Sequence, residues 1–182
     1  YKRHPRVSVT IDILAQAELE AALVEDRIDV GLAFSDVDSD EIEVERVQDD
    51  ELCLIVGKQH PMYRRDKVRV PQLKHADLAL LSQAFITRAP IDRYFRTNNV
   101  RPRIAIEANS ADSIIAIVRG APIATVMPSA TARQLPGLKA IPLVPSAGIW
   151  TLSVLQRKGA YRSAASKALI AIVKQRRSDA GL

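Results

Sequence analysis

The sequence is poor in the residues that build metal and redox sites. It has one cysteine, Cys53, and three histidines that are scattered along 182 residues. One cysteine excludes an internal disulfide framework, and no histidine has a second ligand at the spacing of a metal site. Cys53 stands in the strand-like run "ELCLIV", so we expect a buried and unreactive thiol.

The motifs that hold nucleotides or activate a nucleophile are also missing. The seven glycines form no G-x-G-x-x-G, no phosphate-binding P-loop and no G-x-S-x-G elbow. Carboxylates are plentiful, but their spacing does not pair them for acid–base catalysis. We therefore predict that the chain is not an enzyme and that it has no cofactor.

The acidic stretch from Asp36 to Asp40 resembles the start of a calcium-binding loop. Asp36, Asp38 and Asp40 alternate as the first ligands of such a loop do. Glu41 then stands where the turn glycine is required, and Val47 where the bidentate glutamate is required. We interpret this stretch as a linker and predict no metal site.

Long apolar runs are absent as well. The longest are far too short to cross a bilayer, so we expect no membrane partner. No signal peptide and no initiator methionine open the chain, which we interpret as a fragment boundary. With 47% hydrophobic and 26% charged residues, the chain suits one compact domain or two small lobes around a real core.

Charge of one sign is not concentrated in the sequence. The formal net charge is +5, and the densest basic clusters lie at residues 2–6, 64–67 and 174–177, in expected loops or termini. We interpret them as solvated surface. Helix-turn-helix, zinc-finger and basic-zipper patterns are missing, so we do not expect this segment to read bases.

Strand-like and helix-like segments alternate along nearly the whole chain, which indicates an α/β architecture with mostly parallel sheets. Apolar alternation, continuous apolar runs and turn residues predict strands over 7–14, 28–34, 78–84, 101–108, 123–128, 138–145 and 149–159, and two more strands with an acidic turn between them over 42–62. Helical periodicity predicts helices over 17–27, 70–77, 87–99, 110–120 and 163–177.

The chain is predicted to form two lobes. Residues 1–36 and 146–182 are assigned to lobe I and residues 37–145 to lobe II, with hinge crossings near 35–42 and 136–148. Two crossings make a hinge, and a cleft between lobes is a common site for ligands.

The stretch "IEANSADSIIAIV" places Asn109 and Ser110 between a strand and a helix. As N-cap, Asn109 would accept a hydrogen bond from the backbone of Asp112, whose side chain would bond back. The same corner could also hold a ligand, because free amides at a helix start attract small anions. Both interpretations stay open. Ser82 and Thr87 follow another buried strand and could present hydroxyls at the same edge, or satisfy their own loop.

Five segments in this order resemble the effector-binding domains of LysR-type transcriptional regulators. They are "ELEAALVEDRIDVGLAF", "ELCLIVGKQHPM", "LALLSQAFITRAPIDRYF", "IEANSADSIIAIVRGAPIATVMPSA" and "PGLKAIPL". The similarity covers nearly the whole chain. Within the family, "LLS-AF-TR--ID-Y" and "IEANS" look most like the regulator of the cyanate operon.

The resemblance implies a two-lobed fold like that of type 2 periplasmic binding proteins, with an effector in the cleft between the lobes. It implies a cytoplasmic homo-oligomer, a dimer or tetramer, whose N-terminal helix-turn-helix domain, absent from this sequence, binds DNA. It places the loops of Ser82, Thr87, Asn109 and Ser110 at the cleft, with Pro128 and Ser129 at the next strand end and Phe34 near the hinge. For Phe34, core packing is the alternative. The effector would be a small molecule, and the cyanate likeness suggests a small anion.

The family also opens its effector domain with a strand and a helix that this sequence lacks, so we expect one wall of the cleft to be missing. A solute-binding protein of a transport system, with the same fold, is the alternative function. Recovering the upstream coding sequence would separate the two, because a regulator has a helix-turn-helix there and a transport protein a signal peptide.

Overall fold

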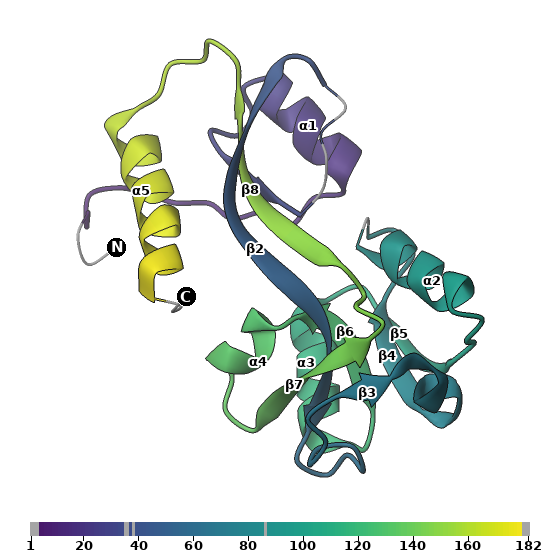
Figure 1. The fold of residues 1–182 in the computed structure, drawn as a ribbon. Helices are drawn as coiled ribbons and strands as arrows, with labels where there is room; N and C mark the ends of the chain where they lie inside the picture. Colours follow the sequence, from purple (N-terminus) through teal and green to yellow (C-terminus); the bar gives the residue numbers. More distant parts are fainter. Residues whose placement is uncertain (1–3, 35–36, 38, 86, 180–182) are drawn as a thin grey trace. The chain divides into compact units, whose positions relative to one another are not determined.

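The computed structural model describes residues 4–34, 37, 39–85 and 87–179. The chain forms two compact units (Figure 1). Unit 1 comprises residues 1–48 and 151–182, and unit 2 comprises residues 49–150. The lobe boundaries expected from the sequence remain a prediction.

Unit 1 is built around a short strand and two helices. Its elements are α1 (Gln16–Val24), β1 (Gly31–Ala33), α5 (Ala164–Asp179) and the adjoining parts of β2 (Ile42–Gly57) and β8 (Ile149–Arg157). Strand β1 pairs antiparallel with β8. Leu155 of β8 packs with Leu23 of α1, whereas its neighbour Val154 packs with Ile170 of α5. The alternation of side chains along a strand thus gives each helix its own small core.

Unit 2 is a mixed sheet. Its strands are β3 (Val68–Arg69), β4 (Asp77–Leu81), β5 (Arg103–Ala108), β6 (Ala124–Pro128), β7 (Leu138–Val144) and the second half of β2. Its helices are η1 (Val70–His75, a 3₁₀ helix), α2 (Arg88–Thr97), α3 (Ala111–Gly120) and α4 (Ala130–Gln134). The order β2-β6-β4-β5 has β4 parallel to both β5 and β6, while β2 is antiparallel to β6 and to β7. The expectation of mostly parallel sheets is therefore corrected.

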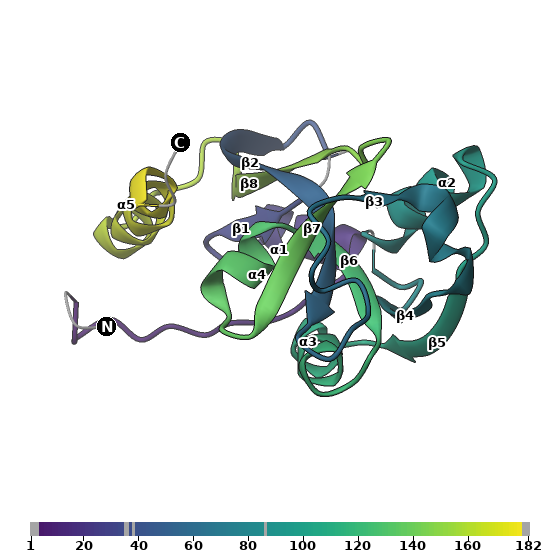
Figure 2. The same ribbon diagram turned by 60° about the horizontal axis from the view of Figure 1, so that its bottom comes forward.

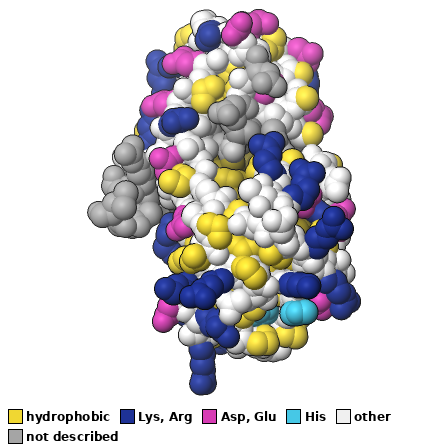
Figure 3. Space-filling view, turned by 45° about the vertical axis from the view of Figure 1, so that its right-hand side comes forward, with side chains coloured by type: hydrophobic (Ala, Val, Ile, Leu, Met, Phe, Trp, Pro, Cys, Tyr) yellow, Lys and Arg dark blue, Asp and Glu magenta, His cyan; other side chains and the backbone are white. Residues whose placement is uncertain are grey.

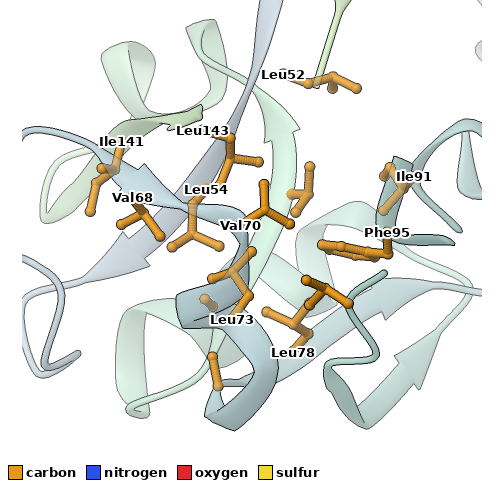
Figure 4. Close-up of a cluster of buried hydrophobic side chains, with 14 of the residues drawn as sticks. Leu52, Leu54, Val68, Val70, Leu73, Leu78, Ile91, Phe95, Ile141 and Leu143 are labelled. Carbon is orange, nitrogen blue, oxygen red and sulfur yellow. The ribbon is translucent and has the colours of Figure 1, made fainter. Parts of the chain in front are cut away.

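The core of unit 2 explains the apolar run "LCLIV" in β2. Leu54 and Val56 face one cluster, which η1 and α2 cover with Leu73 and Phe95 (Figure 4). Cys53 and Ile55 face the other cluster, which α3 and α4 cover, and Figure 2 shows α3 on the opposite side of the sheet from α2. A strand buried on both faces has no polar alternation.

The expected strand over residues 7–14 does not form. Its alternating side chains Val9, Ile11 and Ile13 are exposed, Ile11 by 85%. No described strand pairs with it, so the predicted β-α-β unit is not completed. Alternation predicts a strand's two faces, but a strand also needs a neighbour for its backbone hydrogen bonds.

The two strands expected between residues 42 and 62 are one strand, β2, and no turn forms at Asp49–Asp50. Asp50 is buried and its carboxylate is bonded, which lets the extended chain continue through an acidic pair. The short helix α4 was not predicted. Of the suspected calcium-loop start, Asp36 and Asp38 lie outside the described residues. Across the part of the chain that is described, no helix is long and apolar enough to span a membrane.

Candidate functional site

Three strands of unit 2 end at one edge of the sheet. The backbone N–H of Ser82, just after β4, donates to the carbonyl of Ala108 at the end of β5 over 2.8 Å. Leu78 of β4 pairs in parallel with Ala124 of β6, and counting along both strands places Ser82 level with Pro128. We call this the carboxyl edge of unit 2. Ligands of open α/β sheets bind outside such edges.

Asn109 and Ser110 turn the chain from β5 into α3. The N-cap is Ser110, whose Oγ accepts the backbone N–H of Ser113 over 3.4 Å, so the predicted cap by Asn109 is wrong by one residue. Asn109 is exposed, and its carboxamide bonds to none of the described residues. One residue therefore caps the helix, and the carboxamide of the residue before it has no partner among the described residues.

The loop between β4 and α2 holds a second set of free groups. Thr87 stands at the N-cap position of α2, but its backbone is already helical and its side chain does not cap. Its Oγ1 is buried and has no hydrogen-bond partner among the described residues. The half-buried Ser82 hydroxyl is likewise unbonded there. A buried hydroxyl without a partner costs about 1–3 kcal/mol, and folded proteins keep few of them.

Arg88 fixes this loop from inside. Only 4% of its side chain is exposed. Its Nη1 donates to the carbonyl of Leu81 over 2.6 Å and to Glu107 over 2.8 Å, and its Nε donates to Asp92 over 2.9 Å. Burial alone would lower the pKa of Arg88, but the two carboxylates outweigh it and raise the pKa. The guanidinium is thus neutralised within the chain and ties the end of β4 to β5 and α2.

Ser129 follows β6, and its hydroxyl is already bonded. It donates to Asp50 over 2.6 Å and accepts from Nη1 of Arg133 over 2.7 Å. The other oxygen of Asp50 accepts the backbone N–H of Ala130 over 2.7 Å, which caps α4. Pro128, half-buried, ends the strand.

Of the predicted site residues, Ser82, Thr87, Asn109, Ser110, Pro128 and Ser129 all belong to unit 2, and the strand ends bring them to its carboxyl edge. Phe34 belongs to unit 1, just after β1, with 39% of its surface exposed. Asp50 and Glu107 were not predicted. Arg88 and Asp92 stand four residues apart on one helix, which is a detectable signal. The sequence contains no such signal for Asp50, because its hydrogen-bond partners lie 79 residues or more away along the chain.

Cys53 is buried as expected, and its environment disfavours the thiolate. Burial raises the pKa of the thiol to about 11, and the negative charges of Glu51 and Asp50 add a smaller increase. The positive charge of Arg133 partly opposes them. Nowhere in the described ranges do three or more histidine, cysteine or acidic side chains gather as a metal site would require. A polar hollow of about 270 Å³ lies in unit 1, between the end of β8 and the turn after α1, and includes none of the predicted residues.

Comparison with known proteins gives one consistent result. The family model described as the LysR substrate binding domain matches residues 1–178. The HTH-type transcriptional regulator CysL of Bacillus subtilis (strain 168) is 22% identical over 135 residues, which are 74% of this chain and 45% of that protein. A probable RuBisCO transcriptional regulator of Thalassiosira pseudonana is 25% identical over 174 residues, covering 89% of this chain and 56% of that protein. The chain spans about half the length of these relatives.

Solved structures share the fold at low identity. The regulatory domain of Synechocystis PCC6803 CcmR in complex with 2-PG superposes with a TM-score of 0.79 at 13% identity, over 97% of this chain and 86% of that one. The effector binding domain of QuiR in complex with shikimate gives a TM-score of 0.75 at 18% identity, over 100% and 87% of the two chains. The predicted α/β fold of the type 2 periplasmic-binding-protein kind is thereby confirmed.

Proposed function

Since the chain belongs to the LysR substrate-binding domain family, we propose that it is the ligand-sensing and oligomerisation domain of a LysR-type transcriptional regulator. A small effector would bind at the carboxyl edge of unit 2 and would modulate DNA binding by an N-terminal helix-turn-helix domain of the whole protein. The solute-binding alternative is not favoured, because the curated relatives are transcriptional regulators.

The buried Oγ1 of Thr87, which has no described partner, is the observation that carries the proposal. An effector oxygen or nitrogen would supply that partner, and the Ser82 hydroxyl and the Asn109 carboxamide lie at the same edge. The start of α3 adds a partial positive charge there. Arg88 would act as a positioning residue, since its ion pairs to Asp92 and Glu107 are already made.

A small anion is the finer version of this proposal. It rests on the start of α3 and on the likeness to the cyanate-operon regulator, while the curated relatives are of the CysL and RuBisCO-regulator kinds. The proposal extends to a cytoplasmic, non-catalytic homo-oligomer. To change DNA binding, the effector must prefer one of two conformations.

The test is the thermal midpoint of unfolding against a panel of small metabolites that includes cyanate, shikimate and 2-PG. A ligand at about a hundred times its Kd should stabilise the fold by about 2.7 kcal/mol, which corresponds to a rise of roughly 5–10 °C. The variant Thr87→Val should lose this rise, because it removes the hydroxyl that the ligand would satisfy.

The chain contains a matched control. Thr125 of β6 has the other buried, unpartnered hydroxyl of the described residues, and it lies in the middle of the sheet next to Ile55. Both Thr→Val changes should keep or raise the midpoint without ligand, but Thr125→Val should keep the ligand response. Equal responses from the two variants, or no response to any ligand by either this chain or its full-length protein, would contradict the proposed site.

A further inference from the structure

The basic excess of the chain lies in one unit. Residues 49–150 contain 14 lysines and arginines and eight aspartates and glutamates, a net charge of +6. Residues 1–48 and 151–182 contain 12 lysines and arginines and 13 aspartates and glutamates, a net charge of −1. Unit 2 therefore carries more than the whole formal charge of +5.

Within unit 2 the cations gather at the edge opposite the carboxyl edge. This basic edge is formed by the amino ends of β4, β5, β6 and β7 and by the loop after β2. Its basic residues are Lys58, Arg64, Arg65, Lys67, Lys74, Arg101, Arg103, Arg119 and Lys139.

Strand register places these elements at one edge. Val56, next to the last residue of β2, pairs with Ala124 at the start of β6 and with Lys139 near the start of β7. Leu78 near the start of β4 pairs with the same Ala124. The C-terminal turn of α3 joins the edge at Gly57, where an added Cβ would lie 3.2 Å from Cα of Arg119.

The carboxylates at this edge are few and already used. Asp66 in the loop pairs with Lys139 over 3.5 Å, and Asp77 pairs with Arg103 over 3.3 Å. The seven other cations are exposed and form no ion pair with any described residue. Figure 3 shows lysine and arginine side chains on the lower part of this face, some of them beside the histidine, as well as higher on the molecule.

The chemistry of the basic edge fits a phosphate backbone better than a protein partner. Protein interfaces depend on aromatic and apolar anchors, and Ile104 is the one large apolar side chain exposed near this edge in the described ranges. Five strands at about 4.8 Å spacing make an edge of roughly 19 Å. Duplex DNA carries on the order of ten phosphate charges over that length.

We propose that the basic edge of unit 2 binds the phosphodiester backbone of duplex DNA without reading bases. Among the described residues, the basic side chains of this edge stand mainly on loops and strand starts. The contacts would therefore be to phosphates and independent of sequence. The effector site proposed above would lie at the opposite edge, so this proposal stands whether or not an effector binds there.

The test is binding of this chain to a labelled 30-base-pair duplex of arbitrary sequence, measured by fluorescence anisotropy in 50 to 200 mM NaCl. We expect a dissociation constant on the order of 10⁻⁵ M at the lowest salt, weakening steeply with salt. The variant carrying Arg64→Glu, Arg65→Glu and Lys67→Glu should bind at least tenfold more weakly. Each lost phosphate contact should reduce the slope of log K against log salt by about 0.9.

A matched control separates the basic edge from net charge. Arg46, Lys158 and Lys167 are exposed, lie in unit 1 and form no ion pair with a described residue. Their joint change to glutamate alters the net charge equally and should leave binding within twofold. If the first variant unfolds, Lys58→Glu with Lys74→Glu and Arg101→Glu provides the same test from other elements.

Three results would overturn the proposal. They are no binding at 50 mM NaCl, an equal loss in the unit 1 control, and binding of polyglutamate as tight as that of the duplex. The last result would assign the surface to an acidic protein partner.

Discussion

Two adjacent residues at the start of α2 differ in how well the fold satisfies them. Arg88 is buried, and its guanidinium donates to two carboxylates and a carbonyl. Thr87 is half-buried, and its buried Oγ1 bonds to no described residue. A buried charge is tolerated only when it is paired and hydrogen-bonded. The sequence showed both residues as polar, but only their surroundings separate a structural group from a group available to a ligand.

Replacing Arg88 tests its structural role. Arg88→Gln should destabilise the chain by about 2 kcal/mol, because Leu81, Asp92 and Glu107 lose a shared donor. The half-exposed carboxylate of Glu107 can regain water, which keeps the loss below that of a fully buried pair. Urea denaturation measures it. Arg93→Gln, an exposed position of the same helix, should change the free energy of unfolding by less than about 0.5 kcal/mol, and an equal effect of both would contradict the assignment.

At the scale of elements, the corner between β5 and α3 assigns different tasks to neighbouring residues. Ser110 is extended, with φ at −139°, and its Oγ lies over the first turn of α3. Asn109 precedes it and is exposed. The sequence predicted that Asn109 would cap the helix, but Ser110 does so. The reason is that the helix begins at Ala111, one residue later than a cap by Asn109 requires.

Two alanine substitutions separate these tasks. Ser110→Ala should lower the free energy of unfolding by about 0.5 kcal/mol, the low end for a lost N-cap, since the bond to Ser113 is long. Asn109→Ala should leave stability unchanged and should weaken effector binding instead. Denaturation curves with and without ligand distinguish them. A larger stability loss for Asn109→Ala than for Ser110→Ala would restore Asn109 as the cap.

At the scale of the whole molecule, stability is concentrated where a strand has partners on both sides and on both faces. The stretch from Leu52 to Val56 pairs with β6 and β7, and all its side chains are buried. The segment over residues 7–14 has neither. Its side chains Val9, Ile11 and Ile13 are exposed, and from residue 8 on its backbone N–H groups bond to no described residue. Both segments are rich in apolar residues, continuous in one and alternating in the other, but their environments are opposite.

Amide hydrogen exchange should therefore differ strongly between them. Peptides covering residues 52–57 should be among the slowest to exchange, because opening them disrupts both clusters of unit 2. Peptides covering residues 8–14 should exchange within seconds. Mass spectrometry of this chain at neutral pH gives the comparison, and slow exchange over 8–14 would show that these residues are paired with another chain or segment in solution.

The sequence by itself determined the element types over most of the chain, because the periodicities of apolar residues are local properties: α1, α2, α3 and α5 and strands β4 to β8 were predicted at close to their observed positions. It also determined the family, through five segments in order, and the buried state of Cys53. Only the tertiary structure decided what depends on distant partners. It joined residues 42–57 into one strand and left residues 7–14 without a described strand to pair with. It also bonded Ser129 to Asp50 and Arg88 to Glu107, and it brought scattered lysines and arginines to one edge of unit 2. Hydrogen bonds and ion pairs between residues far apart in the chain have no local pattern, so they become visible only when the sheet sets their register.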